Sequence, residues 1–338
     1  MTYTIYNLAE DCGVSVATIS RVINGSDKVS EKTREKVLAA MKAHNYTPNV
    51  FARGMNKMST GIVAVFISDI ANPFFAGIVK GLESTLQKKD IRIILCTTNN
   101  DMEHERREME LMMQKQVDGF IIAGSRPMND TNIDFIRETS RKYPTVLVNS
   151  FMESGPDEKL YSIRVDEKKA SEEALEKILP KYGNLYMFGD EAWRTTKDKE
   201  EAAFNVAKRL GIEFDESHIF KSSHDLSSGR NAARNFLLTA DIKKPCLIFC
   251  VSDQIAIGVS KELSEEKIKI PEEMGVLGFS DIPICTLVTP TISTVNQHIK
   301  EFGEQAAELF IAALSGATAG DKEYFSEYNL VERESTIR

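Results

Sequence analysis

No stretch of this 338-residue sequence approaches the roughly 20 uninterrupted apolar residues that a membrane-spanning helix needs. The opening residues, MTYTIYNLAEDC, lack both the basic segment and the apolar segment of a secretion signal. Five cysteines, an odd number at irregular spacing, suit a reducing compartment better than a disulfide framework. We therefore predict a cytoplasmic protein without a membrane partner.

The sequence also lacks the short motifs of common catalytic and cofactor sites. It contains no G-x-G-x-x-G, G-x-x-x-x-G-K-[ST], G-x-S-x-G or H-E-x-x-H, which excludes the usual nucleotide, nucleophile and zinc signatures. Only five histidines are available as general bases. Cys246 and Cys250 flank an apolar run with no second Cys or His pair nearby, so we interpret them as core residues. The sequence predicts binding without catalysis, and neither a cofactor nor a metal ion.

The composition is that of an ordinary globular protein, but its charge is unevenly distributed. Apolar residues make up 42% and charged residues 27% of the chain, whose length allows two or three domains. Residues 1–60, which we call the head, hold eight Lys or Arg and five acidic residues, a charge of +3. Subtracting these from the 42 basic and 50 acidic residues of the chain leaves 34 and 45, a charge of −11. The head is thus suited to approach a polyanion, although a solvated surface carries the same pattern.

The head has the pattern of three short helices. Apolar residues at spacings of three and four follow Thr4, Ser15 and Ser30, each of which can cap a helix. Gly13 ends the first helix and Asn24-Gly25 ends the second, because these residue types tolerate a left-handed backbone. The predicted inward-facing residues are Ile5, Leu8, Ala9, Cys12, Ile19, Val22, Val37, Leu38 and Met41.

Two short helices joined by a Gly-containing turn and braced by a third indicate a helix-turn-helix domain over 1–48, with a protein-docking bundle as the alternative. In such a domain the second helix lies in the DNA major groove with its first turn against the bases. After Pro48 breaks the third helix, Asn49 can cap a segment over 50–57. Because this segment is shorter than the ~12–15 residues of a stable isolated helix, we predict that it folds only against a partner. We assign 49–60 as a hinge helix and linker.

The stretches TIYNLAEDCGVSVATISRVING and VSEKTREKVLAAMKAHNYTPNVFARGM resemble the N-terminal region of the lactose/galactose repressor family of bacterial transcription regulators. The resemblance runs through almost the whole head and includes the same helix breaks. In that family the second helix reads an operator half-site, and two hinge helices, one per subunit, pack together in the minor groove. The resemblance therefore implies a homodimer on a pseudo-palindromic, double-stranded operator.

Position by position, the resemblance implies a specificity pair at Val16 and Ala17 and a guanine contact from Arg21, for which a phosphate contact is the alternative. The Ala and the Arg at these places resemble the catabolite-control branch of the family. Met55 stands where the family has a wedge that opens the central base step, and its apolar volume suits that role. The DNA-contacting residues implied in this way are Thr4, Ser15, Val16, Ala17, Thr18, Ser20, Arg21, Asn24, Asn49, Ala52, Arg53 and Met55.

From residue 61 onward, apolar β-rich runs alternate with amphipathic helical stretches. This alternation predicts buried parallel strands covered by helices on both faces, and it repeats after the polar break FMESGPDEK. The first strands are predicted at 61–68, 91–98, 119–124 and 145–150, with helices near 73–89, 101–116 and 130–142. The predicted fold is an all-α helix-turn-helix head joined by a hinge helix to an α/β body of two doubly wound parallel-sheet lobes. The predicted N-lobe covers 61–158 and 283–298, and the C-lobe covers 159–282 and 299–338.

The segments ISDIANPFFAGIVKGLE, KQVDGFIIAG, SDQIAIG, VLGFSD and TPTISTVNQ resemble the effector domain of the same family, which is akin to periplasmic sugar-binding proteins. The wall residues of the interlobe cleft implied by this resemblance are Phe74, Phe75, Asn99, Asp101, Ser125, Trp193, Lys199, Asp253, Phe279, Asp281 and Gln297. Carboxylates and amides form paired hydrogen bonds with vicinal hydroxyls, and aromatic faces stack on the C–H face of a sugar ring. We therefore predict a carbohydrate-like effector.

Several of these residues have a structural alternative. Phe74 and Phe75 suit the core or a dimer interface equally well, and Asp101 suits a helix cap. Asp281 suits a turn. Asp253 is the strongest candidate because it follows a buried strand and opens a helix, although a capping residue would occupy the same place.

The stretch TTKDKEEAAFNVAKRLG departs from the family pattern. The family often has here an arginine, closely followed by Gly and an aromatic residue, that clamps the effector. In this chain Lys197 or Lys199 stands in the equivalent place and the Gly is absent. Lysine is a point charge without the planar fork of arginine. The departure leaves open a phosphorylated or acidic metabolite, a different sugar or no effector.

Together these features predict a lactose-repressor-type regulator, in its simplest form a repressor, that binds its operator as a homodimer. A sugar or sugar phosphate between the lobes sets DNA affinity by changing the spacing of the paired hinge segments. The main alternative is a regulator triggered by a partner protein, as in the catabolite-control branch. A sugar-modifying enzyme is the remote alternative, because no catalytic motif supports it.

Overall fold

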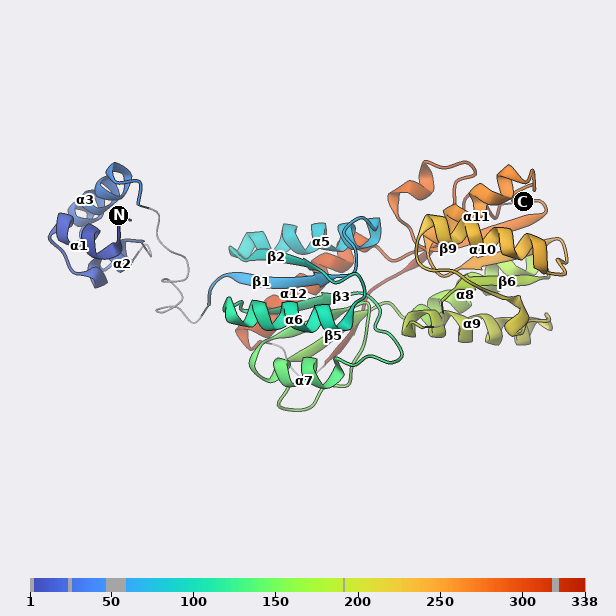
Figure 1. Ribbon diagram of the computed structural model, residues 1–338, viewed down its shortest axis with the longest axis horizontal. Helices are drawn as coiled ribbons and strands as arrows, with labels where there is room; N and C mark the ends of the chain where they lie inside the picture. The colour runs from blue at the N-terminus through green and yellow to red at the C-terminus, as the bar shows by residue number, and fades with distance from the viewer. Residues whose placement is uncertain (1–2, 24–25, 47–58, 191, 318–321, 338) are drawn as a thin grey trace. The chain divides into compact units, whose positions relative to one another are not determined.

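The computed structural model describes residues 3–23, 26–46, 59–190, 192–317 and 322–337. The chain divides into two compact units, Met1–Gly61 and Ile62–Arg338. In its described part the first unit is helical, and the second combines parallel sheets with helices (Figure 1). Each unit is described here by itself.

The first unit holds α1 (Ile5–Cys12), α2 (Val16–Ile23) and α3 (Glu31–Ala43). Thr4 caps α1 in a capping box with Asn7, whose backbone N–H donates to Thr4 Oγ1 at 3.4 Å. Gly13 ends α1 in the left-handed conformation, with a φ of 62°. Ser30 caps α3 by accepting from the backbone N–H of Thr33 at 3.3 Å. The helix starts predicted after Thr4 and Ser30 and the break at Gly13 are thus confirmed.

The core of the first unit consists of the inward faces of its three helices. Its fully or nearly buried members are Leu8, Ala9, Cys12, Ile19, Val22 and Val37. Ile5 and Met41 are partly buried against this core. The prediction for Leu38 was wrong, because its side chain is 49% exposed. Successive residues of an α-helix are rotated by about 100° around its axis. Leu38 therefore points away from the face that carries Val37.

The second unit contains two six-stranded sheets in its described residues, one in each lobe. The N-lobe sheet has the order β11-β5-β4-β3-β1-β2 and the C-lobe sheet β12-β10-β9-β8-β6-β7. Neighbours are parallel except for β10 and β12, which are antiparallel. The N-lobe strands are β1 (Ile62–Ile67), β2 (Arg92–Thr97), β3 (Gly119–Ala123), β4 (Thr145–Val148), β5 (Leu160–Arg164) and β11 (Glu323–Phe325). The C-lobe strands are β6 (Leu185–Gly189), β7 (Ile219–Lys221), β8 (Cys246–Cys250), β9 (Met274–Ser280), β10 (Ser293–Asn296) and β12 (Asn329–Val331).

Helices cover both faces of each sheet. The N-lobe carries α5 (Pro73–Leu86), α6 (Met102–Gln114), α7 (Ile133–Lys142) and α12 (Ile299–Ser315). The C-lobe carries α8 (Glu167–Ile178), α9 (Arg194–Leu210), α10 (Leu226–Thr239) and α11 (Asp253–Glu265). Short 3₁₀ turns lie at Gln87–Lys89, Leu179–Lys181, Glu216–His218 and Pro283–Thr286. None of the described helices is long and apolar enough to cross a membrane.

Alternation along β1 explains the layering of the N-lobe. Val63 and Val65 belong to the cluster that includes residues of α5 and α12, whereas Ala64 and Phe66 pack with residues of α6 and α7. In Figure 1 α5 and α12 accordingly lie on one face of the sheet and α6 and α7 on the other. Where α5 meets α12, a Cβ on Gly81 would lie 2.1 Å from the Lys300 carbonyl oxygen. Only glycine permits this close helix contact.

The predicted lobe boundaries need correction at four elements. Strand β11 was assigned to the C-lobe, but it pairs with β5 in the N-lobe sheet. Strand β5 was assigned to the C-lobe, but it pairs with β4 in the N-lobe sheet. Strand β10 was assigned to the N-lobe, but it pairs with β9 in the C-lobe sheet. Helix α12 was assigned to the C-lobe, but it packs on α5 in the N-lobe. The described chain crosses between the lobes after β5, after β10 and after β11, and apolar alternation carries no information on these crossings.

The five cysteines are buried and have free thiols. Burial raises the pKa of the Cys96 thiol to about 11 and that of Cys246 to about 12. Cys246 and Cys250 lie at the two ends of the buried strand β8, so their assignment to the core is confirmed.

Candidate functional site

Helix α2 of the first unit presents two predicted DNA-contacting side chains on one exposed face. Ser15 opens the helix, with its Oγ accepting from the Thr18 backbone N–H at 3.2 Å. Ile19 and Val22 are buried in the head core and fix the inward face. Ala17 and Arg21, one helical turn apart, are both exposed. This is the geometry of a helix that can lie in a groove.

The other predicted DNA contacts differ in their surroundings. Val16 is only partly exposed because it packs against the head core. Thr18 and Ser20 are half-buried on the same helix. The hydroxyl of Thr4 is engaged in capping α1. The remaining predicted contacts, Asn24, Asn49, Ala52, Arg53 and Met55, and the predicted hinge helix of which the last four are part, lie outside the described residues.

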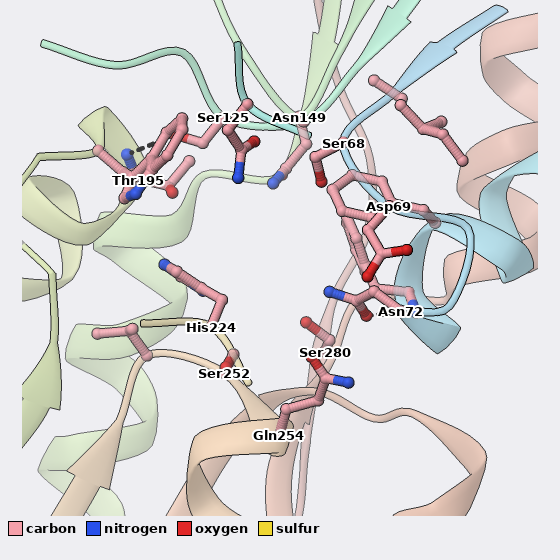
Figure 2. A pocket seen from close by; sticks show the side chains of 18 of the residues that line it. Ser68, Asp69, Asn72, Ser125, Asn149, Thr195, His224, Ser252, Gln254 and Ser280 are labelled. Atoms are coloured by element: carbon pink, nitrogen blue, oxygen red, sulfur yellow. Dashed lines mark hydrogen bonds between the residues drawn. The ribbon is translucent and has the colours of Figure 1, made fainter. Parts of the chain in front are cut away.

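A cavity of about 370 Å³ lies between the two lobes of the second unit. Its wall is formed by residues at the carboxyl ends of strands from both sheets, as expected for doubly wound sheets. Ser68 and Asp69 follow β1, Asn149 follows β4, and Ser252 follows β8. Figure 2 shows Asp69, Ser125 and Asn149 facing His224, Ser252 and Gln254 across this space.

Eight of the eleven predicted wall residues line the cavity. They are Phe74, Phe75, Ser125, Trp193, Lys199, Asp253, Phe279 and Gln297. Phe74 and Phe75 begin α5 and meet edge to face, with ring centroids 5.3 Å apart. Both side chains are also buried in the N-lobe core, so the pair packs in the core and borders the cavity at the same time.

The remaining three predicted wall residues do not line the cavity. Asp101 caps α6 by accepting from the His104 backbone N–H at 2.9 Å, a bond that lowers the pKa of its carboxyl. Asp281 forms an ion pair with Arg333, with Nη1 and Oδ1 2.8 Å apart. Asn99 adopts a left-handed turn with a φ of 51°, and its neighbour Asn100 reaches the wall instead. Asp101 and Asp281 both come after a strand, but a helix cap and an ion pair with a residue far along the sequence hold their side chains away from the cavity.

Asp253 is 1% exposed and both its carboxylate oxygens are occupied by C-lobe groups. Oδ1 accepts from Thr294 Oγ1 at 2.6 Å, and Oδ2 accepts from the Ile282 backbone N–H at 2.9 Å. Burial raises its pKa to about 6, against the effect of these hydrogen bonds. Ser252, and not Asp253, caps α11. Asp253 therefore joins the ends of β8, β9 and β10 beneath the wall.

Lys199 and Glu167 form a buried ion pair at the wall, each with about 3% of its surface exposed. Gln297 Nε2 donates to Glu167 Oε1 at 3.4 Å, and Lys199 Nζ lies 4.2 Å from the centroid of the Phe279 ring. Burial raises the pKa of Glu167, while the adjacent ammonium opposes this rise. Glu167 was missed at the sequence level, although it directly follows the chain crossing after β5.

The loop after β3 is held by a buried charge cluster and contacts the C-lobe. Arg126 Nη1 lies 2.7 Å from Glu105 Oε2, and Arg126 Nε lies 2.7 Å from Asp130 Oδ2. Pro127 and Trp193 form an antiparallel bridge between the lobes. Around it, backbone N–H groups donate from Met128 to Ala192, from Arg194 to Arg126, and from Thr195 to Ser125 Oγ, at 2.8, 3.2 and 3.2 Å. We call this set of contacts the interlobe bridge.

Sequence reasoning missed several polar wall residues. Asp69 directly follows the predicted strand 61–68, so the position of that strand end could have identified it. Asn149 lies within the predicted strand 145–150, which in the structure already ends at Val148. Asn149 is 8% exposed, and its Oδ1 accepts no hydrogen bond from any described residue. His224 lies after β7, a strand that was not predicted. Burial, with the added effect of the Lys199 charge, lowers the pKa of His224 to about 4, so its ring is neutral near pH 7.

The wall combines aromatic rings with neutral and paired polar groups. Aromatic faces can cover the apolar face of a ring, and amide, hydroxyl and carboxylate groups can bind its hydroxyls. Among the described residues there is no group of three or more His, Cys, Asp or Glu that could hold a metal ion. By its chemistry this wall can bind a small molecule that carries several hydroxyl groups.

Comparison with known proteins assigns both units. The profile for "bacterial regulatory proteins, lacI family" matches residues 4–49, and the profile for a periplasmic binding protein-like domain matches residues 183–336. The HTH-type transcriptional regulator RegA of Clostridium saccharobutylicum is 32% identical, with all of both chains covered. Catabolite control protein A of Staphylococcus xylosus is 31% identical over 90% of each chain, in agreement with the resemblance of the head to that branch.

Solved structures show the same fold. A complex of the transcriptional regulator CelR with cellobiose is 27% identical, with a TM-score of 0.71, and covers 98% of this chain and 99% of its own. The lac repressor dimer bound to operator and the anti-inducer ONPF is 20% identical, with a TM-score of 0.87 and 99% of both chains covered. These matches confirm the predicted helix-turn-helix head and the two parallel-sheet lobes of the body. The chain belongs to the LacI family of bacterial regulatory proteins and is a DNA-binding transcriptional regulator.

Proposed function

We propose that this regulator binds its operator through α2 and that a small polyhydroxylated effector in the interlobe cavity sets its affinity for DNA. The observation that carries this proposal is the cavity itself. Its volume of about 370 Å³ falls in the range of small-molecule sites, ~300–1,000 Å³. Its wall comes from both lobes, so a bound molecule can change how the lobes are held together.

A sugar is the effector that this wall fits best. Phe74, Trp193 and Phe279 supply aromatic rings, and Asn149 supplies a buried acceptor that a ligand hydroxyl can satisfy. The CelR structure, named as a complex with cellobiose, supports this choice. Of the residues predicted from the sequence, we retain six as effector contacts, and we retain Lys199 and Asp253, which are bound by other protein groups, only as part of the cavity wall. We do not retain Asn99, Asp101 and Asp281.

The DNA contacts are proposed from the geometry of α2. Ala17 and Arg21 share its exposed face, which supports base contacts from these two residues. Segment 49–57 is too short to form a stable isolated helix by its sequence, so we propose that it couples effector binding to DNA binding by ordering on the operator. Hydrogen exchange of residues 50–57 tests this step. Slower exchange with operator DNA is expected, and equal exchange with and without DNA contradicts it.

The remaining parts of the proposal follow from the role of a DNA-binding regulator. We infer a homodimer that acts as a repressor on a pseudo-palindromic operator, because two copies of α2 match two half-sites. We infer binding without catalysis, since the relatives are transcriptional regulators. We place the protein in the cytoplasm, where its DNA is.

Tryptophan fluorescence provides a direct test of the effector site. Trp193 is the single tryptophan of the chain and lies in the cavity wall. We expect its emission to change with at least one member of a panel of sugars and sugar phosphates, and the same molecule to change affinity for an operator selected from random DNA. No response to any member contradicts the proposed effector and favours a partner protein as the trigger.

A further inference from the structure

Both cationic side chains of the cavity wall, among the residues that the structure describes, are committed to carboxylates of the protein. Arg126 uses Nη1 for Glu105 and uses Nε and Nη2 for the two oxygens of Asp130, at 2.7, 2.7 and 2.9 Å. Because the guanidinium is 3% exposed and bound on three nitrogens, it has little capacity left for a ligand.

Lys199 is committed in the same way. Its ammonium is paired with Glu167 on one side and lies over the Phe279 ring on the other. Turning Lys199 toward a ligand anion would leave Glu167 buried without a counter-charge, which is strongly destabilising in a protein interior. Lys199, although it lines the cavity, is therefore not available as an anion clamp while Glu167 is ionised.

The carboxylates of the wall outnumber its cations, so an added anion meets net negative charge. Glu105 and Glu167 are used by the two cations, and Asp253 is saturated by Thr294 and the Ile282 backbone. Among the described wall residues a positive ligand group finds no unpaired buried carboxylate either, because the other two wall carboxylates, Asp69 and Asp225, are exposed to solvent. The unsatisfied buried group at the wall is instead the neutral amide oxygen of Asn149, among the side chains that the structure describes.

We propose that the cavity selects an uncharged polyhydroxylated ring, and that Glu167 sets this selectivity by withholding Lys199 from the ligand. This inference rests on the proposed effector function and narrows it, since sugar phosphates are excluded. Glu167 thus determines specificity indirectly, because its ion pair keeps the Lys199 ammonium from binding a ligand anion.

The test uses matched sets of ligands on the full-length protein, followed by Trp193 fluorescence. Each set contains one hexose, its 6-phosphate and its 2-amino derivative, for glucose, galactose and mannose. We expect the best uncharged sugar to bind at least tenfold more tightly than its phosphorylated and amino derivatives. Equal or tighter binding of a 6-phosphate or an amino sugar overturns the inference.

Substitutions then test the role assigned to Glu167. In Glu167→Gln the amide no longer neutralises Lys199, so affinity for the 6-phosphate relative to the parent sugar should rise at least tenfold. The double variant Glu167→Gln with Lys199→Met should lose this gain, because the freed ammonium is gone. An unchanged ratio in a folded Glu167→Gln protein overturns the proposal.

Glu262→Gln serves as a matched control. Glu262 is also buried and ion-paired, with Oε2 3.0 Å from Arg230, but it lies away from the cavity. This change should leave the phosphate-to-sugar ratio as in the unmodified protein. A shift of the same size as in Glu167→Gln would mean that the ratio reports lost stability and not selectivity. If no uncharged or charged sugar alters the emission, the proposed effector function itself fails, which is a distinct result.

Discussion

The two candidate sites handle charge in opposite ways. On α2 the Arg21 side chain lies exposed, where it can meet a phosphate or a base edge. At the cavity wall Arg126 and Lys199 are buried and neutralised by the protein's own carboxylates. Exposed cations bind a polyanion by releasing counterions and respond to salt, whereas buried ion pairs are screened little. Cationic side chains thus serve recognition in one unit and the positioning of other protein groups in the other.

The largest expected effect comes from breaking the buried cluster of Arg126. Arg126→Met leaves Glu105 and Asp130 buried without their partner, so the free energy of unfolding should fall by about 3–5 kcal/mol. Urea denaturation measures this change. Arg107→Met is the control, because Arg107 pairs with Glu103 at 3.1 Å on the exposed surface of α6. There we expect a loss below about 1 kcal/mol. Similar losses in both variants contradict the distinction.

The next effect is the pH dependence that Asp253 contributes. Its pKa is about 6 in the folded protein against a usual value of 3.8, so the folded state holds the proton more tightly than the unfolded state. Stability from this group is present below pH 4 and is lost as the pH rises toward 6, by about 3 kcal/mol in total. The loss should be absent in Asp253→Asn.

Unfolding experiments at several pH values between 4 and 7 check this prediction. The stability of the unmodified protein relative to Asp253→Asn should decrease across the window. A difference that does not vary with pH contradicts the assignment of the titration to Asp253.

A smaller effect is expected at the DNA-reading helix. Arg21→Ala should weaken operator binding by about 1–3 kcal/mol if the guanidinium binds a guanine, and should reduce the salt dependence of the binding constant. Arg21→Lys separates the two roles, since lysine keeps the charge and loses the fork. Full recovery of affinity and sequence preference in Arg21→Lys would show that Arg21 contacts a phosphate.

The smallest effect concerns the outward face of α3. Leu38→Ser should change the free energy of unfolding of the head by no more than about 0.5 kcal/mol, because Leu38 is half exposed. Val37→Ala removes buried methyl groups one residue away and should cost about 1–2 kcal/mol. Thermal unfolding of the two variants compares the faces directly. A larger decrease in the free energy of unfolding for Leu38→Ser than for Val37→Ala would contradict the assignment of Leu38 to the outward face.

The sequence predicted most of the helices and strands correctly, but it did not predict which sheet each strand joins. Strands such as β1 and β3 are apolar runs bounded by breaks, so local composition is sufficient to find them. The sheet that β5 or β10 joins depends on pairing with residues elsewhere in the chain, which no local pattern contains. Strand β7 has only three residues and a mixed burial pattern, and it was not predicted.

The same division applies to the cavity wall. Asp253 was the strongest prediction because it follows a strand and opens a helix, and strand ends meet at the cleft by topology. Asp281 follows β9 as well, yet Arg333 near the far end of the chain draws it away. The pairing of Lys199 with Glu167 also joins separate helices, so the sequence alone could not distinguish a free lysine from a neutralised one.

The interlobe bridge has a consequence for engineering. Its contacts are made largely by main-chain groups of Arg126, Met128, Ala192 and Arg194, which remain whatever side chains these positions carry. Phe279 or Asn149 can therefore be replaced to change the ligand preference while the interlobe bridge between the two lobes is kept. In this respect the chain is a suitable scaffold for biosensors in which the recognised ligand is exchanged while the DNA-binding response is retained.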